Sequence, residues 1–344
     1  MALSDYHASV GNWREQLQRN ERKTRMVIAI FLAVYTAVGL FADTMILEYL
    51  HPRASIMECF WALITLQAIP YATLIMIAVA IVSLLITYAL YDRIMLLGTE
   101  SREITPETAK NLQEKQLYNV VEEMKVAAGL HYMPKVYLIE ANYMNAFASG
   151  YSEKSAMVAI TRGLMEKLNR AELQAVMSHE LSHIRHHDIK LTLMVAVLSN
   201  ILLIVIDIMF YSLIYRSDRR RDDNRLLMVI MLLRYLLPLI TVVLALFLSR
   251  TREYMADSGA VELMRDNEPM ARALLKIADD HQRNAEQYTY EYGRTAHEEI
   301  RQASYLFDPS SIDPVKSFHN AFSSHPSVDE RLRALGFKRK NKAS

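Results

Sequence analysis

The chain has 344 residues, of which 52% are hydrophobic and 22% charged, and its formal net charge is only +1. A charge so close to zero, with no basic domain face or nucleic-acid motif, argues against a nucleic-acid-binding protein. The single cysteine, Cys59, excludes a disulfide framework and agrees with a reducing compartment. The apolar residues are bunched rather than periodic, which is typical of a membrane protein.

The chain begins with a polar segment, residues 1–25, that lacks a small-residue cleavage site after the first apolar run, so we expect the first helix to be retained. Two predicted spans follow, at 26–50 and 60–91. The uncharged stretch around the second span runs from Cys59 to Tyr91 and is 33 residues long, more than the roughly 20 that cross the hydrocarbon layer. Basic residues gather before the first span, which predicts a cytoplasmic N-terminus.

Residues 92–190 form a first soluble block, which the two preceding spans place in the cytoplasm. Short strands are expected at 136–139 and 156–160, where β-branched and apolar residues cluster. Helices should surround them in a small mixed sheet. The predicted helices are 106–128, capped by Thr105 and ended by Gly129, and 170–187, capped by Asn169.

The second of these helices carries His179-Glu180-Leu181-Ser182-His183. Residues four apart share a helical face, so His179 and His183 can reach one metal ion. Glu180 is turned enough to contact the water of that metal instead. This pattern is typical of zinc hydrolases and predicts one Zn²⁺ per chain.

Two further apolar segments, 191–215 and 226–249, are predicted to cross the membrane as the third and fourth spans. They are joined by a basic loop, 216–225, and each contains one charge, Asp207 and Arg234 respectively. Antiparallel helices would put these charges at matching depth, where they either form an intramembrane ion pair or face water separately. A full double crossing and a buried hairpin both remain compatible with the loop, whose arginines oppose the positive-inside tendency.

The second soluble block, 250–344, is expected to supply the third zinc ligand. Glu253 would complete a His, His, Glu set and leave the fourth position to water, as catalytic zinc requires. Asp257, one turn further on, suits a carboxylate behind a histidine ligand. His186 and His187 are expected to be solvated. Because only about one helical turn separates the fourth apolar segment from Glu253, the metal should lie close to the membrane surface.

Several sequence motifs in this order resemble the HtpX family of bacterial inner-membrane zinc metalloproteases, which are related to type I CAAX prenyl proteases. The motifs are Asn145-Ala146-Phe147-Ala148-Ser149-Gly150, His179 to His183 followed by Asp188, Ser249-Arg250 with Glu253-Tyr254 and Ala256-Asp257, and His325-Pro326 with Arg331. The resemblance covers most of the chain. The fold it implies is mainly α, a polytopic membrane protein with a gluzincin-type α+β protease domain and a small mixed sheet.

The resemblance implies that Asn145, Ala146, Phe147 and Ala148 form an edge strand that binds an extended substrate. Strand addition to an exposed sheet edge supports this role, while a simple hairpin turn is the structural alternative. It also implies that His325 and Arg331 lie at the cleft and stabilise the oxyanion. The structural alternative is that the His-Pro pair caps and initiates a helix over 328–335.

The resemblance implies zinc-dependent endopeptidase cleavage of damaged or misfolded membrane proteins on the cytoplasmic side of the bacterial inner membrane, in quality control and stress response. Glu180 would act as general base and His325 would assist. The expected partners are membrane-protein substrates and the lipid bilayer, and the oligomeric state stays open. Two alternatives remain, a CAAX-type prenyl-protein endopeptidase and a non-hydrolytic chaperone or scaffold that keeps zinc for stability. Intact Glu180 argues against the second alternative.

Overall fold

The computed structural model describes residues 3–8, 13–96, 99–150, 152–214, 223–294, 306 and 325–340. The chain divides into two compact units. The sheet unit comprises Met1–Thr24, Tyr88–Leu191 and Leu246–Ser344, and the helical unit comprises Arg25–Thr87 and Thr192–Ala245. The sheet unit therefore draws together both of the soluble blocks predicted from the sequence.

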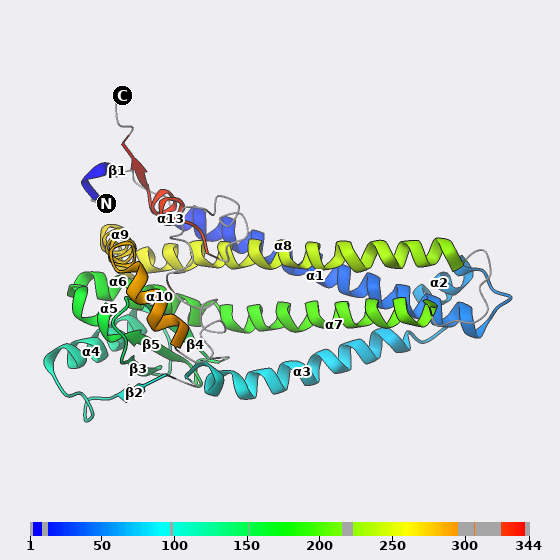
Figure 1. Ribbon diagram of the computed structural model, residues 1–344, viewed down its shortest axis with the longest axis horizontal. Coiled ribbons are helices and arrows are strands. Elements are labelled where there is room, and N and C mark those ends of the chain that lie inside the picture. Colours follow the sequence, from blue (N-terminus) through cyan, green and yellow to red (C-terminus); the bar gives the residue numbers. More distant parts are fainter. Residues whose placement is uncertain are drawn as a thin grey trace. The chain divides into compact units, whose positions relative to one another are not determined.

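A four-stranded mixed sheet lies within the sheet unit (Figure 1). Its order is β2 (Ser101–Ile104), β3 (Lys135–Ile139), β5 (Met157–Thr161) and β4 (Ala146–Ser149). β3 and β5 are parallel, and the other two pairings are antiparallel. The small mixed sheet is thus confirmed, and β4 lies at one of its edges. A second sheet pairs β1 (Tyr6–Ala8) with β6 (Phe337–Arg339).

Helices and one short 3-10 helix accompany these sheets. They are η1 (Leu3–Asp5), α4 (Leu112–Ala128), α5 (Arg162–Lys167), α6 (Arg170–Arg185), α9 (Glu268–Arg283), α10 (Ala285–Arg294) and α13 (Val328–Ala334). α6 packs against α4, α9 and β4, and nearly all of its side chains from Leu173 to Ile184 are buried. Asn169 and Glu172 form a reciprocal capping box at its start, an arrangement whose loss costs about 1 kcal/mol. The predicted helix and its cap are confirmed.

The helix predicted at 106–128 begins later than expected. Thr105 instead closes a turn, where its hydroxyl accepts a hydrogen bond from the Thr108 amide at 3.2 Å. α4 begins after Asn111, whose side chain accepts from the Glu114 amide at 2.9 Å. Asparagine is the stronger N-cap, so the prediction of Thr105 was wrong. Gly129, with φ of 71°, ends the helix as predicted.

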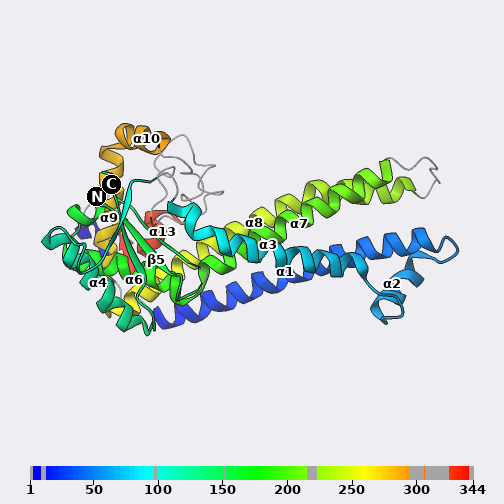
Figure 2. The same ribbon diagram turned by 90° about the horizontal axis from the view of Figure 1, so that it is seen from below.

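The helical unit contains the apolar parts of long helices. Their bounds are α1 (Trp13–Leu50), α3 (Tyr71–Leu96), α7 (Asp188–Ile214) and α8 (Asp223–Met264), and a short helix, α2 (Ile56–Ile64), follows α1. Among the described residues, three helices are long and apolar enough to cross a membrane, at 14–50, 191–214 and 227–264, and 71–87 forms a shorter apolar helix. α7 and α8 lie side by side in both views (Figure 2). The chain is therefore mainly α and has the helices of a multi-pass membrane protein.

The apolar stretch predicted as one span over 60–91 is divided in the structure. α2 ends at Ile64, Leu66 has a positive φ of 58°, and α3 starts after Pro70. The Asp43 carboxylate of α1 accepts hydrogen bonds from the Ala72 and Thr73 amides at 2.6 and 2.9 Å. The first amides of a helix have no partner within it, so Asp43 satisfies donors that the break exposes. The sequence reasoning missed this break, although the polar residues Thr65 and Gln67 and the helix breaker Pro70 mark it.

The expected pairing of Asp207 with Arg234 is confirmed. Arg234 Nε of α8 lies 2.7 Å from Asp207 Oδ1 of α7. The guanidinium also lies over the Phe210 ring, 4.4 Å from its centroid, which adds a cation–π contact. Of the predicted loop at 216–225, residues 216–222 lie outside the described residues, and 223–225 belong to the first turn of α8.

Candidate metal centre

The two histidines of α6 point their Nε2 atoms at one another. These atoms are 3.1 Å apart, and the two side chains are almost completely buried. The rings meet edge to face, with centroids 4.8 Å apart. Spacing by one helical turn puts His179 and His183 on the same face, and the burial of α6 keeps that face away from bulk water.

Glu253 reaches the same point from α8. Its two carboxylate oxygens lie 3.6 Å from His179 Nε2 and 3.6 Å from His183 Nε2. Within the described residues, His179, His183 and Glu253 form the group whose donor atoms, all within 4.8 Å of one another, could hold a metal ion. The structure thus brings together the three ligands expected from the sequence.

Close approach of α8 to α6 depends on Gly259. A Cβ atom at this position would lie 2.4 Å from Ser182 Oγ and 2.9 Å from Ser182 Cβ, well inside contact distance. Glycine therefore lets the backbone of α8 pass directly over Ser182, which lies beside His183 in the sequence. This close approach brings α8, which carries Glu253, against the helix that carries the two histidines.

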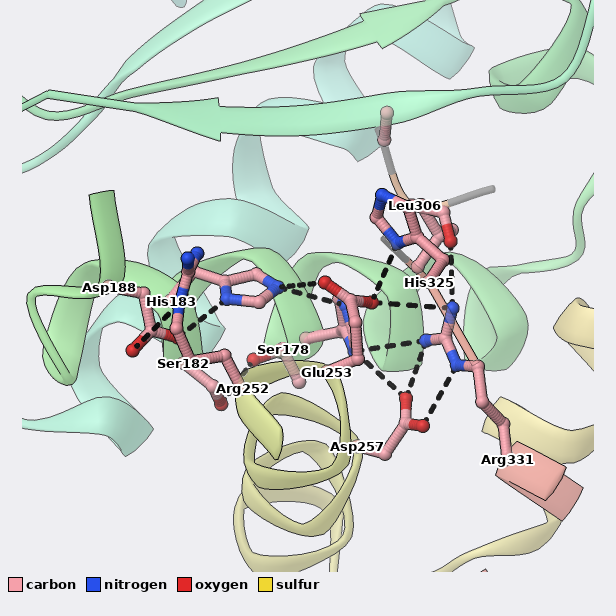
Figure 3. A network of polar contacts seen from close by, with 12 residues as sticks. Ser178, Ser182, His183, Asp188, Arg252, Glu253, Asp257, Leu306, His325 and Arg331 are labelled. Carbon is pink, nitrogen blue, oxygen red and sulfur yellow. Dashed lines mark hydrogen bonds and ion pairs between the residues drawn. The ribbon is translucent and has the colours of Figure 1, made fainter. Parts of the chain in front are cut away.

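Each histidine has a carboxylate behind it. His179 Nδ1 lies 3.0 Å from Asp257 Oδ1. His183 Nδ1 lies 2.7 Å from Asp188 Oδ2 (Figure 3). An Nδ1–H that donates to a carboxylate leaves Nε2 with its lone pair directed into the site. Asp257 was expected in this role, whereas the sequence reasoning assigned no role to Asp188.

Arginines hold both carboxylates in turn. Arg331 donates to the two oxygens of Asp257 from Nε at 2.9 Å and Nη2 at 2.6 Å, and Arg252 Nε lies 3.5 Å from Asp188. Burial alone would raise the pKa of Asp257 and of Asp188, but the adjacent arginines and the histidine hydrogen bonds lower both values. Both carboxylates therefore stay ionised and keep the imidazoles in one tautomer.

His179 and Glu253 have strongly shifted pKa values in the metal-free site. Burial works to lower the pKa of His179, but its hydrogen bonds to Asp257 and Glu253 outweigh burial and raise the pKa to about 9. Burial works to raise the pKa of Glu253, but the adjacent His325, His179 and His183 outweigh burial and bring this pKa well below the usual value. An ion that binds here must therefore displace a proton from His179, and it meets a carboxylate that is already ionised.

Glu180 supplies the test of whether a metal fits. Its side chain is 1% exposed, and neither carboxylate oxygen has a hydrogen-bond partner among the described residues. Burial raises its pKa. A buried carboxylate without partners is costly unless something else satisfies it, and a metal with its water would do so. Two imidazoles, a glutamate and an orphaned carboxylate therefore fit a divalent metal with an open position.

His325 and Arg331 also lie at this centre. His325 Nδ1 is 3.5 Å from Glu253 Oε2, and its side chain is 5% exposed. The N-cap of α13 is Ser327, which forms a capping box with Glu330. His325 is therefore not the residue that caps this helix. Arg331, expected at the cleft, donates to Asp257 from Nε and Nη2, and its Nη1 donates to the Leu306 carbonyl at 2.7 Å.

The predicted substrate strand coincides with β4 and the residue before it. Asn145, Ala146, Phe147 and Ala148 are all buried, and Phe147 packs in a hydrophobic cluster with Tyr143 and Met157. The Ala146 carbonyl accepts a hydrogen bond from the Leu306 amide at 2.9 Å. The strand is at the sheet edge, as expected, but one of its backbone groups already contacts another part of this chain.

Sequence reasoning missed Asp188, Gly259 and Leu306, and it treated His186 too simply. The position of Asp188 was a usable signal for such a role, because it is an acidic residue in the first turn of the helix that follows the motif. His186 is partly buried against α8 rather than fully solvated, and burial lowers its pKa. His187 is exposed, as expected.

Comparison with known proteins places this geometry in a family. The sequence matches peptidase family M48 over residues 111–337. A "Protease HtpX homolog" from Helicobacter pylori strain J99 is 38% identical over 325 residues, which cover 94% of this chain and 98% of the relative. One from Listeria monocytogenes is 36% identical over 265 residues, covering 72% and 83%.

Among solved structures, Ste24p of S. mikatae is 18% identical, with a TM-score of 0.47 and coverage of 91% of this chain and 65% of that one. The family match spans well over half of the chain, and the Helicobacter pylori relative matches almost end to end. This chain therefore belongs to peptidase family M48 and is a membrane metalloprotease of the HtpX type.

Proposed function

We propose that this protein is a zinc-dependent endopeptidase that cleaves damaged or misfolded membrane proteins on the cytoplasmic face of the bacterial inner membrane. One observation carries the catalytic part of the proposal. Two Nε2 atoms and the Glu253 carboxylate converge beside Glu180, a buried carboxylate without a hydrogen-bond partner among the described residues.

The proposed ligands are His179, His183 and Glu253, a donor set typical of catalytic zinc. When bound, zinc supplies a water of lowered pKa and polarises the carbonyl of the scissile bond. A structural zinc site would have four protein ligands and no need of a base, whereas this site has three close donors and Glu180 beside them.

Glu180 is the proposed general base. Its raised pKa brings it closer to neutrality, where a carboxylate can both accept a proton from the attacking water and return it to the departing amine. Asp257 and Asp188 hold the two imidazoles in the ligand tautomer, and Arg331 orients Asp257. His325, buried beside Glu253, is the proposed donor to the developing oxyanion.

Membrane substrates are proposed because of the position of Glu253 in the chain. The apolar part of α8 ends at Ser249, and Glu253 lies only four residues further along the same helix. Because a helix rises about 1.5 Å per residue, Glu253 lies close to the end of the apolar part of α8. This proximity favours substrates that are delivered in the plane of the membrane. The basic residues before the first span favour a cytoplasmic N-terminus and protease domain. The relatives named as HtpX homologues support a role in membrane-protein quality control and stress response.

The first experiment compares the wild type with Glu180→Gln in detergent, by zinc content and by cleavage of an unfolded membrane protein. Glu166→Gln on α5, a half-exposed glutamate away from the site, is the matched control. We expect equal zinc in all three proteins and loss of cleavage by at least about 1,000-fold in Glu180→Gln alone, since removal of a general base and its charge costs several powers of ten. Cleavage by Glu180→Gln at the wild-type rate would refute the assignment. A zinc-loaded wild type that cleaves only soluble peptides would refute the substrate class.

A further inference from the structure

We propose that one face of α7 is a docking surface for a transmembrane helix of a misassembled protein, which it recognises through a polar side chain that this helix exposes within the membrane. The proposal rests on the proposed peptidase function and names the feature by which a substrate is selected. The surface belongs to the part of α7 that lies in the helical unit, residues 192–214.

This face of α7 carries hydrogen-bonding and small residues. Successive positions are separated by four, four, seven and four residues, so they form a stripe along a helix with 3.6 residues per turn. Asp207 is half-exposed and the other members are exposed. The polar face, as we call it, consists of Thr192, Ala196, Asn200, Asp207 and Tyr211.

The ion pair at the polar face is not enclosed by the helical unit. Asp207 and Arg234 contact each other, yet their side chains remain 48% and 30% exposed. Asp207 lies seven residues before the end of α7 at Ile214, which is about 10 Å along the helix axis and therefore inside the apolar span. Charged groups within a span are costly unless protein groups surround them. The exposure of this pair therefore points to a partner.

Asn200 adds a second polar group, nearer to the middle of the span. It is exposed and lies nine residues after the start of the apolar segment at Leu191. Its side-chain nitrogen donates to the Ala196 carbonyl at 3.0 Å, which uses one donor of a group that has two donors and an acceptor. Polar groups without partners are costly in hydrocarbon, whereas a neighbouring helix with a hydrogen-bonding side chain would satisfy them.

The chemistry of the polar face favours a different protein over lipid and over a second copy of this chain. Lipid acyl chains offer no hydrogen bonds to Asn200 or Asp207. A two-fold axis along the membrane normal that packed α7 against α7 would place two copies of Asp207 side by side, and like charges repel. Ala196, which is small, allows the backbone of another helix to approach closely.

A misassembled membrane protein supplies such a helix. Folded bundles enclose polar side chains between their helices, so these side chains become exposed when assembly fails. The polar face offers acceptors from Asp207, and the adjacent Arg234 guanidinium offers donors. It can therefore bind either kind of polar group, and it selects for the exposure of that group rather than for a particular sequence.

The binding test uses zinc-loaded full-length protein in proteoliposomes, with Glu180→Gln in every variant so that nothing is cleaved. The probes are three synthetic apolar helices of about 21 residues, each with a photoactivatable leucine. One carries Gln at its centre, one carries Gln seven residues nearer to one end, and one has Leu at both positions. Cross-link yield against the mole fraction of peptide gives the affinity, and mass spectrometry identifies the cross-linked segment.

Asn200→Leu removes the polar group near the middle of the span, and Asp207→Leu with Arg234→Met removes both charges so that neither is left unpaired. Thr36→Val on α1 is the matched control, because Thr36 is also exposed and donates to a carbonyl one turn back, that of Leu32, at 2.9 Å. Zinc content and unfolding temperature show whether each variant is folded. If the double variant unfolds, Asn200→Leu decides the question by itself.

We expect the two Gln helices to cross-link to α7 and to bind about three- to tenfold more tightly than the Leu helix. Asn200→Leu should abolish the advantage of the central Gln, the double variant that of the displaced Gln, and Thr36→Val neither. Equal affinity of the three helices would mean that lipid covers the polar face, and overturns the proposal. Cross-links between α7 of two protein copies that the Gln helices do not diminish would assign the face to a second copy and overturn it as well.

Cleavage by proteins that retain Glu180 separates this inference from the proposed function. The substrates are the central-Gln helix and the Leu helix, each followed by the same unfolded tail. Asn200→Leu should raise KM for the Gln substrate about three- to tenfold and leave its kcat and the cleavage of the Leu substrate unchanged. If the wild type cleaves both substrates and KM does not respond, the inference fails and the peptidase function stands. If the Gln helices bind as expected and nothing is cleaved, the peptidase function fails and the docking surface stands.

Discussion

Arg331 and Asp257 form a buried bidentate pair, with Nε and Nη2 donating at 2.9 and 2.6 Å to the two carboxylate oxygens. Asp257 Oδ1 is in turn 3.0 Å from His179 Nδ1. A side chain near the C-terminus thus fixes the orientation of a histidine on α6. Removal of the guanidinium fork would leave Asp257 with its charge buried and its direction undetermined.

Arg331→Lys should therefore lower zinc affinity about 10- to 100-fold, the usual effect of losing the group that orients a ligand. Lysine keeps the charge but offers no planar fork for a carboxylate. Zinc dissociation constants from chelator competition measure the effect. Arg333→Lys, on the exposed side of the same helix, is the control and should bind zinc like the wild type. Equal affinity in both variants would contradict a positioning role for Arg331.

Gly259→Ala should separate α8 from α6. Its new Cβ would lie 2.4 Å from Ser182 Oγ, and such overpacking costs about 1–3 kcal/mol of stability. Loss of zinc affinity should accompany the lower unfolding temperature, because Glu253 lies on the displaced helix. In the double variant with Ser182→Gly, both atoms that oppose the new Cβ are removed, so much of the lost stability and zinc affinity should return. A double variant no better than Gly259→Ala would show that Ser182 is not the obstacle.

Zinc binding should strengthen as the pH rises. The metal-free protein holds a proton on His179, whose pKa is raised to about 9, and that proton must leave when the ion binds. Apparent affinity should increase about tenfold per pH unit between about pH 6 and 8. The proton stabilises the metal-free fold below the ordinary histidine pKa of about 6.5, and this contribution is lost as the pH rises through about 9.

Chelator competition at several pH values measures this dependence, and calorimetry in buffers of different ionisation enthalpy detects the released proton. Because protons compete with zinc for His179, we also expect the protein to lose metal and activity in acid. Zinc affinity that is independent of pH, or full activity at about pH 5, would contradict a protonated ligand in the metal-free site.

Asp207 and Arg234 should behave as a coupled pair in a bilayer. Asp207→Asn or Arg234→Gln alone leaves one unpaired charge within a span, whereas the double variant leaves none. Each single variant should therefore lower the unfolding temperature in lipid nanodiscs more than the double variant does. The exposed pair Arg185 and Glu262 in the sheet unit is the control, and its two losses should be small and additive. Additive losses at Asp207 and Arg234 would show that the pair contributes no coupling energy.

Local features of this protein could be predicted from the sequence because neighbouring residues determine them. The capping box at Asn169, the end of α4 at Gly129 and the shared face of His179 and His183 all follow from the helical repeat. The pairing of Asp207 with Arg234 needed only two antiparallel helices whose charges lie at matching distances from the connecting loop. Thr105 failed as a cap because Asn111, a stronger competitor, lies six residues further along the chain.

The sequence by itself determined that His179 and His183 could bind one metal, because this depends on spacing within one helix. It also determined which segments were apolar enough to span a membrane, because this depends on local composition. Only the tertiary structure decided that Asp43 caps α3, that Gly259 admits α8 against α6, and that Arg331 meets both Asp257 and Leu306. These contacts join residues far apart in the chain, and their partners are selected by packing between elements. No local periodicity encodes such a choice, because many residues of suitable chemistry compete for each buried partner.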